Sequence, residues 1–191
     1  MPQRNLKEQL VEGASQVLLE QGYHAASVGD IVAAAGIPKG SVYNHFDSKE
    51  DLAMEVVRRY VSSYPFDALL DPEGSPLARL RTFFSDTIER TVARGVTSGC
   101  LLGNFSTELV GHSDPISELV AESLEQMGRG ATTVLEEARE RGELDAGIDP
   151  GVLGPYLVDA FEGSVARAKV SGSRAPLDSF LDFTFDVLLK R

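Results

Sequence analysis

Apolar residues recur every three or four positions along most of this chain, which is the spacing of helices with one buried face. The pattern predicts a first helix over residues 5–20 and another over 48–62. Four further helices are expected over residues 77–94, 114–141, 150–170 and 177–189. Alternation typical of strands does not extend far enough to predict a sheet. We therefore expect an all-α protein with about nine helices.

Two stretches interrupt this pattern in the middle of the chain. Residues 65–76 contain Asp-Pro and Glu-Gly-Ser-Pro, which favour turns, so this stretch is expected to be a loop. Residues 100–110 form a short piece in which polar and apolar residues are mixed. It follows a Gly95 stop signal and precedes the Asp114-Pro115 start of the next helix.

The stretch from Ser27 to Leu52 predicts two very short helices joined by a tight turn. Ser27 with Asp30 is typical of a helix start, and Gly36 is typical of a helix end. Pro38 suits the first turn of a second helix over residues 38–44. Because so short a helix is not stable alone, it must be held against its neighbours with its polar side outward. This is the arrangement of a helix-turn-helix that enters the DNA major groove.

A specific resemblance accompanies this prediction. It covers roughly the first fifty residues without a gap and rests on an ordered set of restrictive positions. They are Leu10, Ala14, Leu18, Gly22, Tyr23, Ser27, Val28, Ile31, Val32, Ala35, Gly36, Ile37, Lys39, Gly40, Tyr43, Asn44, His45, Phe46, Lys49, Glu50, Asp51 and Leu52. Together these residues resemble the DNA-binding domain of the TetR family of transcriptional repressors. The remainder resembles that family only in helical character and length.

The resemblance implies a division of the chain and a set of DNA contacts. Residues 1–50 would form the three-helix DNA-binding domain, and residues 51–191 a ligand-binding and dimerisation domain. Base edges would be read by Lys39, Ser41 and Asn44, within a motif that includes Gly40. Phosphates would be contacted by Ser27, Tyr43, His45 and Lys49. Pro38 departs from the family, which often has serine there, so no phosphate contact is carried over to it.

The resemblance also implies a function. The chain would be a homodimeric repressor that binds a palindromic double-stranded operator and releases it when a small-molecule effector enters its core. The helix over 48–62 would begin beside DNA and end beside the effector, so that its tilt would change the spacing of the two reading helices.

Candidate effector contacts lie around the only cysteine. Asn104, Glu108 and His112 are four residues apart and would share a helix face, with Cys100 one turn before them. Aromatic residues elsewhere would wall an apolar cavity. The predicted set comprises Tyr60, Phe84, Cys100, Asn104, Phe105, Glu108 and Tyr156. For each of them ordinary packing is the alternative, and Cys100 in particular is interpretable as a small buried filler.

The last two predicted helices carry an unusually wide apolar band. Phe183 and Phe185 are two residues apart, so they cannot both face one core. A band this wide indicates burial on two sides and hence a partner helix. The predicted dimer contacts are Phe161, Gly163, Val165, Phe180 and Leu188.

Composition limits the remaining possibilities. The net charge of −11 opposes nonspecific binding to nucleic acid, and residues 1–59 hold six basic against eight acidic side chains. Contacts doubled by a dimer would have to offset this repulsion. No apolar run is long enough to span a bilayer, no signal peptide is recognisable, and a single cysteine gives no internal disulfide. A cytoplasmic protein is expected.

The chain lacks the sequence motifs of common metal and nucleotide sites, so neither a metal nor a cofactor is expected. An enzyme is the remote alternative, since Cys100 and His112 are too far apart along a helix for proton transfer. A nearer alternative keeps the DNA-binding dimer but places its release under modification of Cys100 or under a protein partner. At a helix start the thiolate would be favoured, whereas a packed thiol would be inert.

Overall fold

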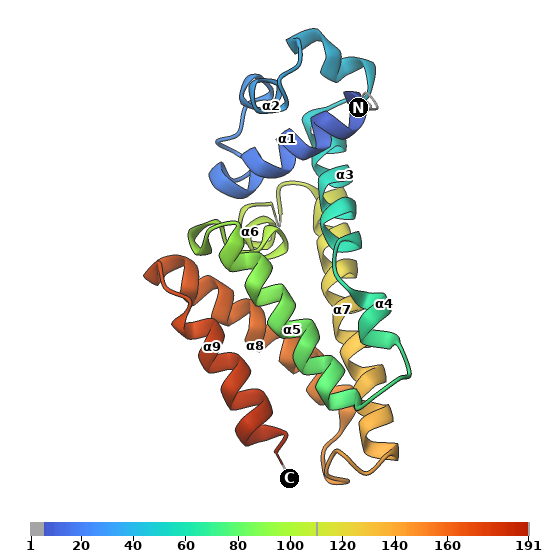
Figure 1. Cartoon of the computed structure of the whole chain (residues 1–191). Coiled ribbons are helices and arrows are strands. Elements are labelled where there is room, and N and C mark those ends of the chain that lie inside the picture. Colours follow the sequence, from blue (N-terminus) through green and yellow to red (C-terminus); the bar gives the residue numbers. More distant parts are fainter. Residues whose placement is uncertain (1–5, 110, 191) are drawn as a thin grey trace. The chain divides into compact units, whose positions relative to one another are not determined.

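The computed structural model describes residues 6–109 and 111–190, and every regular element in these ranges is helical. The α-helices, labelled in Figure 1, are α1 (Leu6–Gln21), α2 (Val28–Ala35), α3 (Lys49–Ser62), α4 (Phe66–Leu70), α5 (Pro76–Ala93), α6 (Leu101–Glu108), α7 (Asp114–Glu140), α8 (Pro150–Ser171) and α9 (Ala175–Asp182). Three-residue-per-turn helices occur at η1 (Lys39–Asn44) and η2 (Val96–Ser98), and a π-helix, η3 (Phe183–Leu188), follows α9. The all-α prediction is confirmed.

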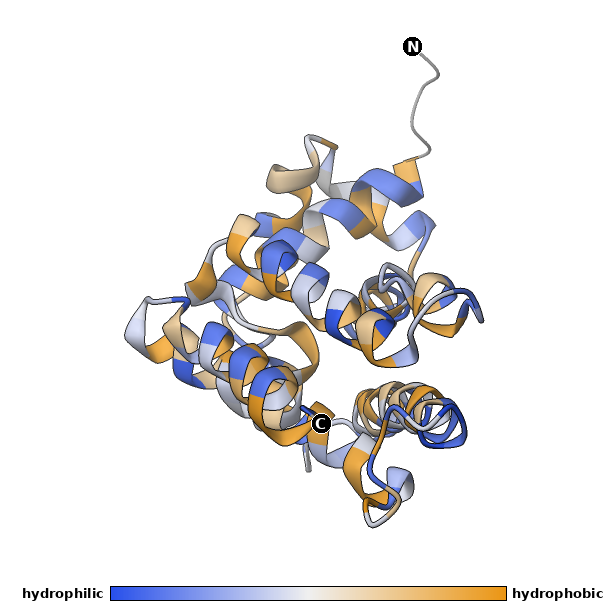
Figure 2. Cartoon of the chain, turned by 60° about the horizontal axis from the view of Figure 1, so that its bottom comes forward, coloured by the Kyte–Doolittle hydropathy of each residue, from blue (hydrophilic) through white to orange (hydrophobic). Residues whose placement is uncertain are grey.

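The described chain groups by its contacts into two compact units. Unit 1 comprises Met1–Ser63 and Leu101–Ala121, and unit 2 comprises Tyr64–Cys100 and Glu122–Arg191. Most helices carry both apolar and polar residues around their circumference (Figure 2), as amphipathic helices with one buried face do. The functional boundary after residue 50 stays a prediction.

Unit 1 is built on a core that the helix-turn-helix shares with α1 and α3. Leu10 and Leu18 of α1, Ile31 of α2, Val42 of η1 and Leu52 of α3 are each completely buried. A Cβ added to Gly13 of α1 would lie 2.7 Å from the backbone nitrogen of Ala35, so α1 and α2 cross almost backbone to backbone. Burial of Val42 therefore holds η1 in place, as its short length requires.

The caps around α2 follow the sequence prediction. The Ser27 hydroxyl accepts from the Asp30 N–H at 3.1 Å, and the Ser27 N–H donates to the Asp30 carboxylate at 2.9 Å. This reciprocal pair is a capping box, and the Ser27 hydrogen bonds hold the pKa of Asp30 below its usual range. Gly36 ends the helix with φ of 66°, in the left-handed region where glycine avoids a steric penalty.

Three elements differ from the sequence prediction. The second helix of the helix-turn-helix is the narrower η1. The expected loop over 65–76 contains one short helix, α4, which buries Leu69 in unit 2. The last helix does not run uniformly from 177 to 189, because α9 gives way to the π-helical η3 at Phe183.

Unit 2 has an aromatic core. Phe84 of α5, Phe161 of α8 and Phe180 of α9 lie with ring centroids 5.1 to 5.5 Å apart, two of the three pairs edge-to-face. Phe185 is buried beside Phe84, whereas Phe183 has 58% of its surface exposed. The expectation that Phe183 and Phe185 face different ways is confirmed.

The closest approach in unit 2 lies between α7 and α8, at Gly154. A Cβ there would lie 2.8 Å from the Thr132 nitrogen and 2.9 Å from the Gly128 oxygen, both backbone atoms that cannot rotate away. Gly154 is therefore required by packing rather than by backbone conformation.

We expect Gly154→Ala to lower the free energy of unfolding by about 1–3 kcal/mol, because α7 and α8 must separate to admit the methyl group. The matched control is Gly130→Ala on α7, where an added Cβ meets only side-chain atoms at 3.7 Å, an ordinary van der Waals distance. That control should be neutral or slightly stabilising through helix propensity. Urea unfolding of the two variants measures the difference, and equal stabilities would contradict a close contact at Gly154.

Candidate functional site

η1, the second helix of the helix-turn-helix, exposes polar side chains on one side and buries Val42 on the other. Tyr43 has 63% of its surface exposed, and Asn44 and His45 are exposed beside it, while Val42 is completely buried. Ser41 is half-buried. The backbone of Lys39 begins η1, but its side chain lies outside the described residues.

Gly40 and Ser27 occupy special positions in this surface. A Cβ at Gly40 would meet nothing within 4 Å, and the backbone needs no positive φ there. Packing among the described residues therefore does not require this glycine, and its place in the DNA-contacting motif stays a prediction. The hydroxyl of Ser27 is exposed but already serves the cap of α2.

Lys49, predicted to contact phosphate, is engaged inside unit 1. Its Nζ donates to the Tyr23 carbonyl and lies 4.2 Å from the centroid of the Tyr23 ring. Burial lowers the pKa of Lys49, while the charge of Glu108 acts in the opposite direction. A phosphate contact by Lys49 stays a prediction, and the geometry gives this side chain a second role in holding the turn after α1.

Glu108, predicted to line the effector cavity, binds the same turn from the other side. Its Oε2 accepts from the backbone N–H of Tyr23 at 2.7 Å and of His24 at 3.2 Å. At the preceding Gly22, with φ of 80°, a Cβ would lie 2.9 Å from the Glu108 Cδ. We call the Tyr23–His24 backbone held between Lys49 and Glu108 the turn clamp. It joins α6 to the helix-turn-helix within unit 1.

Further contacts support the turn clamp. The Tyr23 ring packs edge-on against Phe105 of α6, and the His24 ring packs edge-on against His112. The hydroxyl of Ser113, in the turn before α7, donates to the carboxylate of Glu50 in the first turn of α3. The segment from α6 to α7 therefore contacts the helix-turn-helix at several points.

His112 corrects one sequence interpretation. α6 ends at Glu108, and Gly111 then takes a φ of 82°, so His112 lies beyond the helix. The expectation that Asn104, Glu108 and His112 line one face of a helix is therefore wrong for His112, because the segment turns before it.

The remaining predicted effector residues are divided between the units. In unit 1, Tyr60, Asn104 and Phe105 each expose no more than 9% of their surface. In unit 2, Phe84 and Cys100 are buried, while Tyr156 has 52% of its surface exposed. Each stays a prediction as an effector contact.

Cys100 has a buried acidic neighbour that the sequence did not indicate, Glu162 of α8. The Cys100 thiol donates to the Glu162 carboxyl, whose Oε1 is buried and has no hydrogen-bond partner among the described residues. Burial raises the pKa of Glu162 to about 7, with the Cys100 hydrogen bond acting in the opposite direction. Cys100 itself exposes only 4% of its surface, and both its packing role and its role in release stay predictions.

The predicted dimer residues are of two kinds. Phe161, Val165 and Phe180 are at least 92% buried within the protomer, whereas Gly163 and Leu188 are exposed. Exposed apolar side chains that the prediction did not include lie nearby, namely Tyr156, Phe183 and Val187. The exposed apolar side chains in this region therefore include residues that the sequence prediction did not place at the interface, and the interface stays a prediction.

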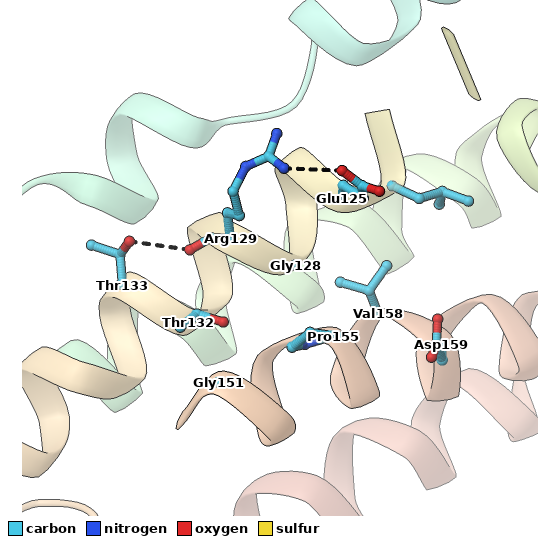
Figure 3. Close-up of a pocket in the computed structure, with 10 residues that line it drawn as sticks. Glu125, Gly128, Arg129, Thr132, Thr133, Gly151, Pro155, Val158 and Asp159 are labelled. Atoms are coloured by element: carbon cyan, nitrogen blue, oxygen red, sulfur yellow. Dashed lines mark hydrogen bonds and ion pairs between the residues drawn. The ribbon is translucent and has the colours of Figure 1, made fainter. Parts of the chain in front are cut away.

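Two grooves in unit 2 were also not predicted. One, of about 490 Å³, lies between α8 and α9 and is lined by Tyr156, Gly163, Phe183 and Leu188 among others. The other, of about 600 Å³, lies between α7 and α8 beside the Gly154 crossing. Figure 3 shows its floor at Pro155 and Val158, with the Arg129–Glu125 ion pair on its rim. No helix of the described chain is long and apolar enough to cross a membrane.

Comparison with known proteins identifies the family. Residues 10–56 match the family described as bacterial regulatory proteins, tetR family, and residues 76–184 match the tetracyclin repressor-like C-terminal domain. The chain is 35% identical over 192 residues to the HTH-type transcriptional repressor DhaR of Mycobacterium sp. (strain GP1), covering 99% of this chain and 95% of the relative. The chain belongs to the TetR family of transcriptional regulators.

Two further likenesses extend over nearly the whole chain. The transcriptional regulator AcuR of Cereibacter sphaeroides is 33% identical over 183 residues, which are 94% of this chain and 84% of AcuR. The crystal structure of the regulatory protein TetR from Rhodobacter sphaeroides superposes with a TM-score of 0.86 at 34% identity, covering 93% of this chain and 95% of that one. This TetR-family protein is therefore a DNA-binding transcriptional repressor and not an enzyme.

The turn clamp yields a first prediction for the site. Glu108→Gln replaces a charged acceptor of two backbone N–H groups by a neutral one, which should lower the free energy of unfolding by about 1–2 kcal/mol. Amide hydrogen exchange should show the loss locally, as faster exchange at Tyr23 and His24. The control is Glu118→Gln at an exposed position of α7. Unchanged protection of both amides would refute the clamp.

Glu162 yields a prediction about pH. Its pKa of about 7 lies above the ordinary 4.5, so the folded protein retains a proton that the unfolded chain has released. The stability that Glu162 contributes is therefore complete below about pH 4.5 and is lost as the pH rises through about 7, by on the order of 3 kcal/mol.

Glu162→Gln should remove this loss. The free energy of unfolding of the wild type relative to the variant should fall between pH 5 and pH 8, as measured by urea unfolding across that range. Parallel profiles for the two proteins would show that the carboxyl is not buried in this way.

Proposed function

We propose that this TetR-family repressor acts as a homodimer on a palindromic operator and is released by a small-molecule effector. The observation that carries the DNA part is η1, where Tyr43, Asn44 and His45 are exposed above the buried Val42. An amide such as that of Asn44 suits the adenine edge, and a phenolic hydroxyl such as that of Tyr43 suits a phosphate. A cytoplasmic location stays part of the proposal.

The dimer is supported by exposed apolar surface on the last helical elements. Tyr156 of α8 and Phe183, Val187 and Leu188 of η3 expose between 36% and 62% of their surface. They adjoin the groove of about 490 Å³ between α8 and α9. A partner that inserts its own copies of these side chains would bury them, in the self-complementary way of a twofold dimer.

The response to an effector is supported by the path from Cys100 to the turn clamp. Cys100 directly precedes α6, and Glu108 ends α6 on the backbone of Tyr23 and His24. A ligand that favours one position of α6 would therefore bias the orientation of the helix-turn-helix, which is a coupling between two sites through one element. Control by Cys100 modification is the second candidate, and the hydrogen bond of its thiol to Glu162 disfavours it.

The DNA assignment is tested with an operator selected from a random duplex pool. Tyr43→Phe removes only the hydroxyl and should weaken operator and unrelated duplexes alike, because phosphate contacts carry no sequence information. Asn44→Ala should reduce discrimination at particular base pairs by about 1–3 kcal/mol. Ser173→Ala also removes a single hydroxyl, at an exposed site in unit 2, and serves as control.

Fluorescence anisotropy at one fixed salt concentration measures all of these affinities. Wild-type binding of both duplexes by Tyr43→Phe would overturn its phosphate contact. Light scattering of the same samples reports the assembly, and a particle of 20.6 kDa at micromolar concentration would contradict the dimer.

A further inference from the structure

Few of the basic side chains in unit 1 are placed to meet a DNA phosphate. Those that the structure describes there are Lys7, Lys49, Arg58 and Arg59. Lys49 donates to the carbonyl of Tyr23 inside the turn clamp. Arg58 and Arg59 lie nine and ten residues into α3, roughly 14 Å from its start, and Arg58 lies 3.7 Å from the carboxylate of Glu55. This leaves Lys7 of α1 as the described basic side chain next to η1.

The ammonium of Lys7 lies against the residue that follows η1. Its Nζ is 5.4 Å from the centroid of the Phe46 ring. Phe46 comes directly after His45, the C-cap of η1, and its N–H donates to the Val42 carbonyl at 3.0 Å, so its backbone continues the last turn of η1. Phe46 exposes only 4% of its surface, whereas Lys7 is exposed. Lys7 therefore reaches the end of η1 from the solvent side, beside the turn that exposes His45.

The contact with Phe46 orients the ammonium and leaves it able to bind an anion. A cation over an aromatic face is attracted by the quadrupole of the ring, and this attraction is weak at exposed sites. A lysine ammonium has three N–H donors, so Lys7 can face the ring and still donate to a phosphate oxygen. Because the ring already restricts the side chain, less rotamer entropy is lost when an anion binds.

The charges around Lys7 show why its own charge matters for DNA. Asp47 follows Phe46 and is exposed, so the surface at the end of η1 also carries an acidic side chain. Glu8 follows Lys7, but adjacent residues on a helix do not face the same side. Without Lys7 this surface would repel a phosphate. The phosphate backbone borders the groove that a reading helix enters, and the end of such a helix contacts it.

We propose that Lys7 binds a DNA phosphate beside η1 and that the Phe46 ring holds it in position. The contact adds affinity for DNA of any sequence and no discrimination between bases. Phe46 is then a positioning residue as well as part of the core under η1. The inference rests on the proposed function, since it adds a contact to the DNA surface around η1. The two fail separately, because the Lys7 variants are judged by salt dependence, whereas the operator and the dimer are judged by base discrimination and particle mass.

The experiment measures how steeply the DNA affinity of the full chain falls with salt. Each neutralised phosphate contributes about 0.9 to the slope of log affinity against log salt concentration. Lys7→Gln removes the charge, whereas Lys7→Arg keeps it and can still stack on Phe46. Arg139→Gln removes one positive charge at an exposed position of α7 in unit 2 and is the control. Fluorescence anisotropy from about 50 to 200 mM sodium chloride gives the slope for the selected operator and for an unrelated duplex.

Lys7→Gln should weaken the binding of both duplexes and flatten the slope by about 0.9 for each protomer bound. Its loss of affinity relative to the wild type should therefore shrink by roughly 3.5-fold per protomer across that fourfold range of salt. Lys7→Arg and Arg139→Gln should keep the wild-type slope. Weaker binding with an unchanged slope would show that Lys7 only supports the fold, and it would overturn the phosphate contact.

A second measurement uses the wild type alone. Operator DNA should protect Lys7 from reductive methylation, whereas Lys169, exposed on α8, should react equally with and without DNA. Mass spectrometry of the digested protein reports both sites. Equal reactivity of Lys7 in the two samples would overturn the contact even if Lys7→Gln failed to fold.

Discussion

The helix η1 is stable only because neighbouring elements pack against it. η1 has six residues, too few to be stable in isolation, and its exposed side cannot contribute to holding it. Its stability comes from Val42 and Phe46 packed beneath it, from the caps of α2, and from the turn clamp that fixes the segment before α2. The exposed side chains of Tyr43, Asn44 and His45 therefore contribute little to the stability of η1.

The same division occurs in unit 2, where packing and chemistry are carried by different residues. Phe84, Phe161 and Phe180 form a core that needs no polar partner. Arg79 and Glu162 have buried polar atoms with no hydrogen-bond partner among the described residues. They lie on α5 and α8, the helices that also carry Phe84 and Phe161. A buried polar group without a full set of partners destabilises the fold, so these atoms reduce the stability that the aromatic core contributes.

Helix caps could be predicted from the sequence, whereas contacts between residues far apart along the chain could not. Ser27 with Asp30 and Gly36 announced the helix-turn-helix because capping involves residues within a few positions of each other. Glu108, by contrast, meets Tyr23 across 85 positions, and no periodicity predicts that contact. Its four-residue spacing from Asn104 suggested a cavity instead. α4 was missed because the proline and glycine signals around it outweighed five residues of weak pattern. The partner of Cys100 was missed because Glu162 lies 62 positions further along the chain, and no local pattern pairs residues that far apart.

The net charge of −11 has a consequence for how the protein would find its site in a genome. This charge repels the phosphate backbone of DNA of any sequence, so contacts away from the operator are weak. Such a protein spends little time sliding on chromosomal DNA, so most copies stay free in solution. Search then proceeds by repeated collision rather than by scanning, and occupancy of the operator follows the free concentration of the repressor closely.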